Sequence, residues 1–120
     1  MVLSAKELAD KIAAAASDKK AQDILLLNME NISPVTDYFI IASAGNSMLV
    51  KAIADNVEDK LAEAGFTATH KEGYAEGRWI LMDYDSCVVH IFLDEERNFY
   101  NLEQLWADAP SEAFVENKND

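Results

Sequence analysis

Two aspartates at alternate positions, Asp83 and Asp85, have the spacing that best suits chemistry in this sequence. On a β-strand, residues i and i+2 share one face and lie roughly 7 Å apart. Two carboxylates on one face can hold divalent metal ions for phosphoryl or nucleotidyl transfer. A metal-dependent transferase is therefore one hypothesis for this chain.

A short turn elsewhere in the chain bears on this hypothesis. Gly45-Asn46-Ser47 stands between an expected strand and an expected helix and resembles the glycine-serine turn of nucleotidyltransferases. In those enzymes the acidic pair follows the turn closely, whereas 38 positions separate Gly45 from Asp83 here. The chain also lacks a basic cluster for a triphosphate, and Asp85 sits where a hairpin would turn, a common place for aspartate. The sequence therefore favours a protein that is not an enzyme, with no catalytic residue, metal or cofactor.

The side chains of Cys87 and His90 are also candidates for a metal site or a nucleophile. Positions three apart on a strand point to opposite faces, so these two cannot share a ligand. Ser86 and His90 share a face but lie roughly 13 Å apart at strand rise, too far for proton transfer. We therefore expect Cys87 to be a small core residue.

Aromatic residues are concentrated in the last third of the chain, close to Arg97. They are Trp79, Tyr84, Phe99, Tyr100 and Trp106. Tryptophan, tyrosine and arginine are the residue types that most often anchor protein interfaces. Strand parity places Trp79 on one face with Leu81 and Asp83, and a carboxylate beside a tryptophan is awkward in a core. We therefore expect this face to bind a partner, although the alternative that Trp79 or Trp106 fills the core stays open.

The residues around Asp85-Ser86 predict the hairpin that would hold these side chains. The runs 79–84 and 87–93 are rich in β-branched and aromatic residues, and a short Asp/Ser connection between such runs is a hairpin signal. Neither run alternates cleanly, so each is expected to be buried on both faces, in part by another protein. The other expected elements are helix 4–17 with a Ser4/Glu7 capping box, strands 23–29 and 38–43, helix 48–64, strand 67–72 and helical turns within 100–106. This order predicts a single α/β domain with a mixed sheet of about five strands flanked by helices.

The overall composition limits the classes of partner. The 120 residues carry 22 acids and 10 bases, a net charge of −12. This charge disfavours direct binding of nucleic acid and suits a basic protein partner. The alternative is that the acidic residues simply keep the protein soluble. With one cysteine, no secretory signal and no membrane-spanning run, a cytoplasmic protein is expected. We expect a folded domain at 1–109 and an acidic, disordered tail at 110–120.

Several segments together resemble the ribosomal silencing factor (Iojap) family. They are Val-Thr-Asp-Tyr-Phe-Ile-Ile at 35–41, Ile-Ala-Asp at 53–55, Trp-Ile-Leu-Met-Asp-Tyr at 79–84, Val-Val-His-Ile-Phe at 88–92 and Arg-Asn-Phe-Tyr-Asn-Leu-Glu-Gln-Leu-Trp at 97–106. The match runs in register from about residue 8 to residue 109. The chain departs from the family pattern at Asp85, where a glycine is usual, in the turn 44–48, and at Asn98, where a basic residue is frequent.

The resemblance implies a noncatalytic factor that binds the large ribosomal subunit through ribosomal protein L-fourteen. Occupying that surface would block joining of the small subunit and so repress translation when nutrients are short. The family fold is related to the nucleotidyltransferases, so it implies a nucleotidyltransferase-like topology, and members self-associate, which makes a homodimer an alternative. Carried over by position, the characteristic residues are Trp79, Asp83, Tyr84, His90, Arg97, Tyr100 and Trp106.

Two other functions stay open on the sequence. One is a nucleotidyltransferase-like enzyme that binds metal and nucleotide through Asp83 and Asp85. The other is a homo-oligomeric module whose apolar strand face serves only self-association.

Overall fold

The two strands expected at the centre of the fold pair with each other in a computed structural model of the protein, which describes residues 3–115. β4 (Trp79–Asp83) and β5 (Cys87–Leu93) form an antiparallel hairpin. The Tyr84 N–H donates to the Cys87 carbonyl (2.8 Å) across the Asp85–Ser86 turn, and the Asp85 backbone has a φ of 74°. The predicted hairpin is confirmed.

The other elements build a mixed sheet around this hairpin. They are α1 (Ala5–Asp18), β1 (Gln22–Asn28), β2 (Tyr38–Ala44), α2 (Ser47–Glu63), β3 (His70–Glu72), α3 (Asp94–Tyr100), α4 (Leu102–Leu105) and β6 (Ser111–Ala113). The strand order is β3-β4-β5-β2-β1-β6, with β2 and β5 parallel and every other pair antiparallel. The α/β class and the mixed sheet are confirmed, with six strands in place of about five. The likeness to nucleotidyltransferase topology stays a prediction.

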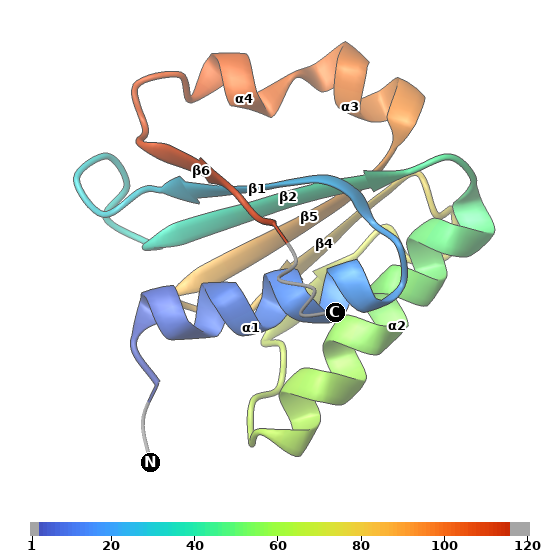
Figure 1. Ribbon diagram of the computed structural model, residues 1–120, viewed down its shortest axis with the longest axis horizontal. Helices are drawn as coiled ribbons and strands as arrows, with labels where there is room; N and C mark the ends of the chain where they lie inside the picture. The colour runs from blue at the N-terminus through green and yellow to red at the C-terminus, as the bar shows by residue number, and fades with distance from the viewer. Residues whose placement is uncertain (1–2, 116–120) are drawn as a thin grey trace.

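The elements are stacked in three layers, with α1 and α2 on one face of the sheet and α3 and α4 on the other (Figure 1). Local sequence signals account for both long helices. Ser4 and Glu7 form the expected capping box of α1, and Asn46 caps α2 by accepting a hydrogen bond from the Leu49 N–H (2.8 Å). The buried stripe of α2 includes Ile53 and Val57, as the four-residue spacing predicts.

The two sheet faces bury separate hydrophobic clusters. Ile40, Met82 and Val89 belong to the cluster under α1 and α2, whereas Ile41 and Phe92 belong to the cluster under α3 and α4. β2 and most of β5 are therefore covered on both faces, as was expected for β5. β4 differs, because Ile80 and Met82 are buried while Trp79, Leu81 and Asp83 on its other face are only partly covered. The chain itself leaves this side of β4 partly open.

In the C-terminal third, one helix was not predicted and one expectation is wrong. The charged run that begins at Asp94 forms helix α3, because three acidic residues in its first turn favour the positive end of the helix dipole, and Asn101 then ends it with a φ of 48°. Residues 110–115 are ordered, because β6 supplies the outer edge of β1 with hydrogen-bond partners and the Phe114 N–H donates to the Ile24 carbonyl (2.9 Å). The expected domain boundary at 109 would thus cut off a strand of the sheet. Residues 116–120 of the expected tail lie outside the described residues.

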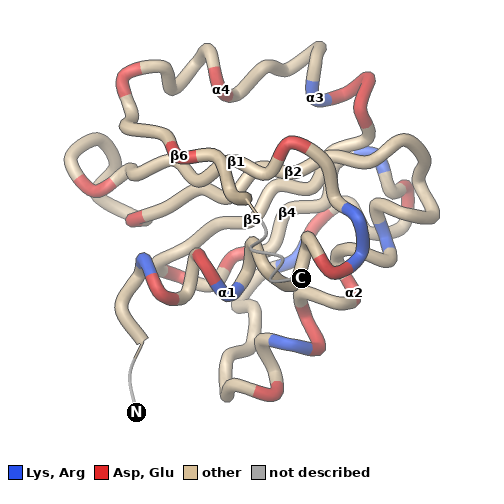
Figure 2. The backbone as a smooth tube through the Cα atoms, viewed as in Figure 1, with Lys and Arg blue, Asp and Glu red and all other residues tan. Residues whose placement is uncertain are grey.

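Charge is spread over the whole molecule. Acidic positions occur in both helical layers and in the loops and outnumber the basic positions (Figure 2). Within residues 3–115, no helix has the length and apolar character needed to cross a membrane.

Candidate partner-binding surface

α3 and α4 leave part of their sheet face open, and an apolar groove of about 370 Å³ lies there. Its lining comes from five places: the loop before β2, the strands β2, β4 and β5, and the turn after α4. The residues that matter below are Val35, Phe39, Leu81, Val88, His90 and Trp106, with Asp83 also lining it. We call this surface the apolar groove.

Strand register explains why these side chains meet. Leu81 on β4 is paired with His90 on β5, and Val88 on β5 is paired with both Asp83 on β4 and Phe39 on β2. Paired residues on neighbouring strands point to the same face of the sheet. Val35, from the loop before β2, is 79% exposed, so the groove is open to solvent at this end.

A row of aromatic side chains continues from the groove to α3. Trp106 lies edge-on to Phe39 (6.0 Å between ring centroids), and Phe39 lies edge-on to His90 (4.8 Å). Trp79 stacks on Phe92 (4.9 Å) and contacts Tyr100 of α3 (4.8 Å). The Trp79 indole N–H donates a hydrogen bond to His90 Nδ1 (3.1 Å), which joins the two halves of the row.

His90 is the polar residue at the centre of this row. It is 5% exposed, and burial lowers its pKa to about 4, so the imidazole is neutral at physiological pH. Because an indole nitrogen can only donate, Nδ1 must be the acceptor and the proton must lie on Nε2. Nε2 is buried and has no hydrogen-bond partner among the described residues.

The structure brings together five of the seven residues suggested by the family resemblance. Trp79, Asp83, His90, Tyr100 and Trp106 all lie on the face that carries α3 and α4. Tyr84 does not, because it is 5% exposed within the cluster under α1 and α2, where burial raises its pKa to about 12. Tyr84 is therefore a core residue.

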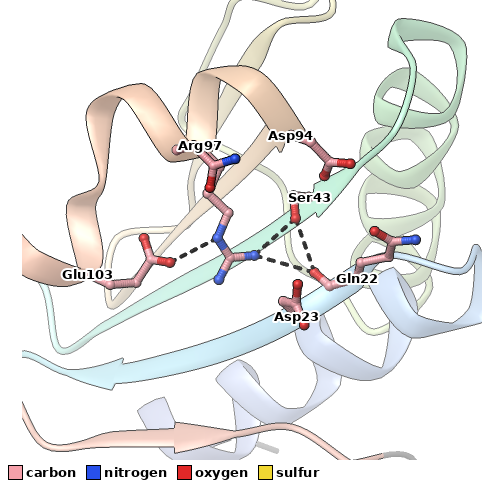
Figure 3. Close-up of a pocket in the computed structure, with 7 residues that line it drawn as sticks. Gln22, Asp23, Ser43, Asp94, Arg97 and Glu103 are labelled. Carbon is pink, nitrogen blue, oxygen red and sulfur yellow. Dashed lines mark hydrogen bonds and ion pairs between the residues drawn. The ribbon is translucent and has the colours of Figure 1, made fainter.

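Arg97 also lies outside the groove, in a separate polar pocket of about 370 Å³ between α3 and the sheet (Figure 3). Its Nε donates to Glu103 Oε2 (2.9 Å), and its Nη1 donates to Ser43 Oγ (3.1 Å) and the Gln22 carbonyl (3.4 Å). The side chain is only 11% exposed. Arg97 thus ties α3 and α4 to the ends of β1 and β2.

Phe39 is a groove residue that the sequence reasoning missed. A signal was available, because strand parity in 38–43 sets Phe39 and Ile41 on one face and Tyr38 and Ile40 on the other. Nothing local, however, indicates that the Phe39 face would be left partly uncovered.

The chemical candidates have structural roles in the part of the chain that the structure describes. Asp83 Oδ1 accepts a hydrogen bond from the Asp85 N–H (2.8 Å), so the pair stabilises the hairpin turn. Cys87 and His90 point to opposite faces, as predicted, and burial raises the pKa of the Cys87 thiol to about 12. Within residues 3–115, no three His, Cys, Asp or Glu side chains are grouped to hold a metal ion.

Comparison with known proteins identifies relatives over almost the whole chain. The family model described as "Ribosomal silencing factor during starvation" matches residues 2–120. The ribosomal silencing factor RsfS of Bacillus subtilis is 50% identical over 83% of this chain and 86% of its own length. The chloroplastic protein Iojap of Zea mays is 36% identical over 82% of this chain and 42% of its own length. A crystal structure of a Chromobacterium violaceum protein is 31% identical with a TM-score of 0.86 and covers 95% of both chains. One from Bacillus halodurans is 38% identical with a TM-score of 0.79 and covers 93% of this chain and 99% of its own. The chain therefore belongs to the ribosomal silencing factor family.

Proposed function

We propose that this protein is a ribosome-associated regulator of translation and not an enzyme. It binds the large ribosomal subunit through ribosomal protein L-fourteen and prevents joining of the small subunit, mainly under nutrient limitation. The single observation that carries this proposal is the open apolar groove and its aromatic row, on a chain that belongs to the silencing factor family. Action on ribosomes suits a cytoplasmic location.

The groove has the properties of a protein-binding surface. Its lining is apolar, and Val35, which is 79% exposed, leaves part of that lining open to solvent. Exposed apolar patches of this kind mark interaction sites, and each Å² removed from water contributes about 25 cal/mol. Half-buried aromatics such as Trp79 are the residue type that most often anchors an interface.

Charge supports a basic partner. Asp83 is partly exposed beside the apolar lining, and the whole chain carries a net charge of −12. A surface of this kind attracts proteins with a basic surface and repels bare phosphate backbone. Contact with a ribosomal protein, and not with ribosomal RNA, fits this distribution.

The proposed mechanism is steric exclusion. No bond is made or broken, and the bound protein occupies space that the small subunit needs. The affinity comes from desolvating the groove, and the selectivity comes from the complementary charge around it.

Val35→Glu is a sharp test of this surface. Val35 is 79% exposed, so the substitution costs the fold little, but in the complex it would bury an unpaired carboxylate against apolar side chains. We expect at least about a tenfold loss of co-sedimentation with isolated large subunits, because 1.4 kcal/mol already corresponds to tenfold. Ala14→Glu on the exposed side of α1 is the matched control, since it adds the same charge on the opposite layer.

Three readouts decide the proposal. Wild-type protein and the Ala14→Glu variant should bind the large subunit, not the small one, and should inhibit subunit joining, whereas Val35→Glu should do neither. Equal binding of the Val35→Glu and Ala14→Glu variants would contradict the proposed surface. A Val35→Glu variant that only dissociates a homodimer, with no ribosome binding by the wild type, would favour self-association instead.

A further inference from the structure

The hydrogen bond between Trp79 and His90 suggests how the binding surface is held in shape. We propose that His90 is a positioning residue whose Nδ1 fixes the Trp79 indole in the orientation that meets the partner. This inference rests on the proposed function, because it concerns how the same surface becomes competent to bind.

The contacts of Trp79 show why such a residue is needed. Its ring stacks on Phe92 with an interplanar angle of 29° and leans on Tyr100 at 47°. Stacking attracts two rings but permits one to slide and turn over the other. A directed N–H···N bond of 3.1 Å to His90 removes that freedom. The acceptor therefore sets which edge of the indole is exposed.

The cost of His90 to the fold supports a role beyond packing. The imidazole is 5% exposed, its Nε2 has no partner among the described residues, and its ring neighbours are Phe39, Trp79 and Phe92. An unpaired buried donor destabilises a fold, and a phenylalanine would fill the same space without one. The property that phenylalanine lacks is an acceptor for the Trp79 indole.

His90 has the chemistry of a constant acceptor. As long as the ring is neutral, Nδ1 carries a lone pair toward the indole, and protonation would replace that lone pair with a second donor. Because the surroundings are apolar and lower the pKa of His90 to about 4, the acceptor is present throughout the physiological range. Trp79 is thus oriented before the partner arrives, which reduces the entropy lost on binding.

Binding measurements on two His90 variants separate positioning from packing. His90→Phe keeps the ring volume but removes the acceptor, and we expect binding to isolated large subunits to weaken about fivefold, the worth of roughly one net hydrogen bond, with an unchanged or higher Tm. His90→Asn can place Oδ1 where Nδ1 lies, and it should bind within about twofold of wild type even if its Tm falls. His90→Phe binding within twofold of wild type would overturn the proposal.

A double-variant cycle identifies Trp79 as the residue through which His90 acts. Trp79→Phe removes the donor, so adding His90→Phe to it should cause no further loss of binding. The same fivefold loss in both backgrounds would show that His90 acts elsewhere and would refute positioning. If Val35→Glu leaves binding intact the proposed surface itself fails, whereas an effect of Val35→Glu without one of His90→Phe refutes only the positioning role of His90.

A spectroscopic measurement tests the inference without ribosomes. In a Trp106→Phe background, Trp79 is the only tryptophan, and a fixed indole gives a structured near-UV circular dichroism band. We expect His90→Phe to flatten this band and His90→Asn to retain it. An unchanged band in His90→Phe would mean that stacking alone orients Trp79.

Discussion

Replacing Arg97 with leucine should loosen the layer formed by α3 and α4. The guanidinium donates to Glu103, Ser43 and the Gln22 carbonyl from a side chain that is only 11% exposed. Leucine keeps much of the aliphatic volume but supplies none of these donors. The negatively charged carboxylate of Glu103 would then lose its ion-pair partner. Its Oε1 is already buried without a hydrogen-bond partner among the described residues.

The structure sets the size of this effect. Removing one member of a fully buried ion pair costs about 3–5 kcal/mol, because the other charge is left without compensation. The Glu103 side chain is 30% exposed, so water can replace part of the lost interaction, and we expect about 2 kcal/mol. Arg97→Leu combined with Glu103→Leu removes both charges and should recover to within about 1 kcal/mol of wild type.

Urea unfolding at pH 7, followed by far-UV circular dichroism, measures the free energies of unfolding of wild type, Arg97→Leu and the double variant. Lys6→Leu is the control, because the Lys6–Asp10 pair on α1 has side chains 41% and 47% exposed and should contribute less than about 0.5 kcal/mol. A loss for Arg97→Leu no greater than that of Lys6→Leu would refute the reasoning. So would a double variant as unstable as Arg97→Leu alone.

Two further predictions follow from buried titratable groups. Burial raises the pKa of the Cys87 thiol to about 12. Ellman's reagent at pH 8 should therefore label Cys87 at least about a hundredfold more slowly in the folded protein than in the urea-unfolded chain. Rapid labelling of the folded protein would show that α1 opens readily. The pKa of His90 is about 4 in the folded protein, whereas an ordinary histidine has a pKa of 6.5, so the unfolded chain takes up this proton first as the pH falls. Folding stability should therefore drop by about 3 kcal/mol between pH 6.5 and 4 relative to His90→Phe. If the urea midpoints of wild type and His90→Phe changed in parallel with pH, this prediction would be wrong.

Several parts of the fold could be predicted because their signals are local. The Ser4/Glu7 capping box begins α1, the spacing of Ile53 and Val57 predicts α2, and the Asp85-Ser86 turn predicts the hairpin. Parity along a strand needs no tertiary information either, so the shared face of Trp79 and Asp83 and the separation of Cys87 from His90 were predicted correctly.

The C-terminal third shows where local signals fail. α3 has no side-chain cap and is seven residues long, so little in its sequence distinguishes it from a charged loop. β6 is three residues of Ser, Glu and Ala, all exposed, and it exists because the edge of β1 offers hydrogen-bonding groups. An edge strand of this kind depends on its neighbour more than on its own composition.

The candidate site divides in the same way. The sequence by itself determined the class of the domain and the face of β4 that carries Trp79, and the family motifs pointed to three of the residues that line the groove, Asp83, His90 and Trp106. Only the tertiary structure decided that the Phe39 side chain lines the groove, that Tyr84 belongs to the core and that Arg97 holds two helices to the sheet. The reason is that the groove forms where β2 lies parallel to β5. This pairing joins residues about 50 positions apart, so its formation depends on packing across the whole domain and not on local sequence.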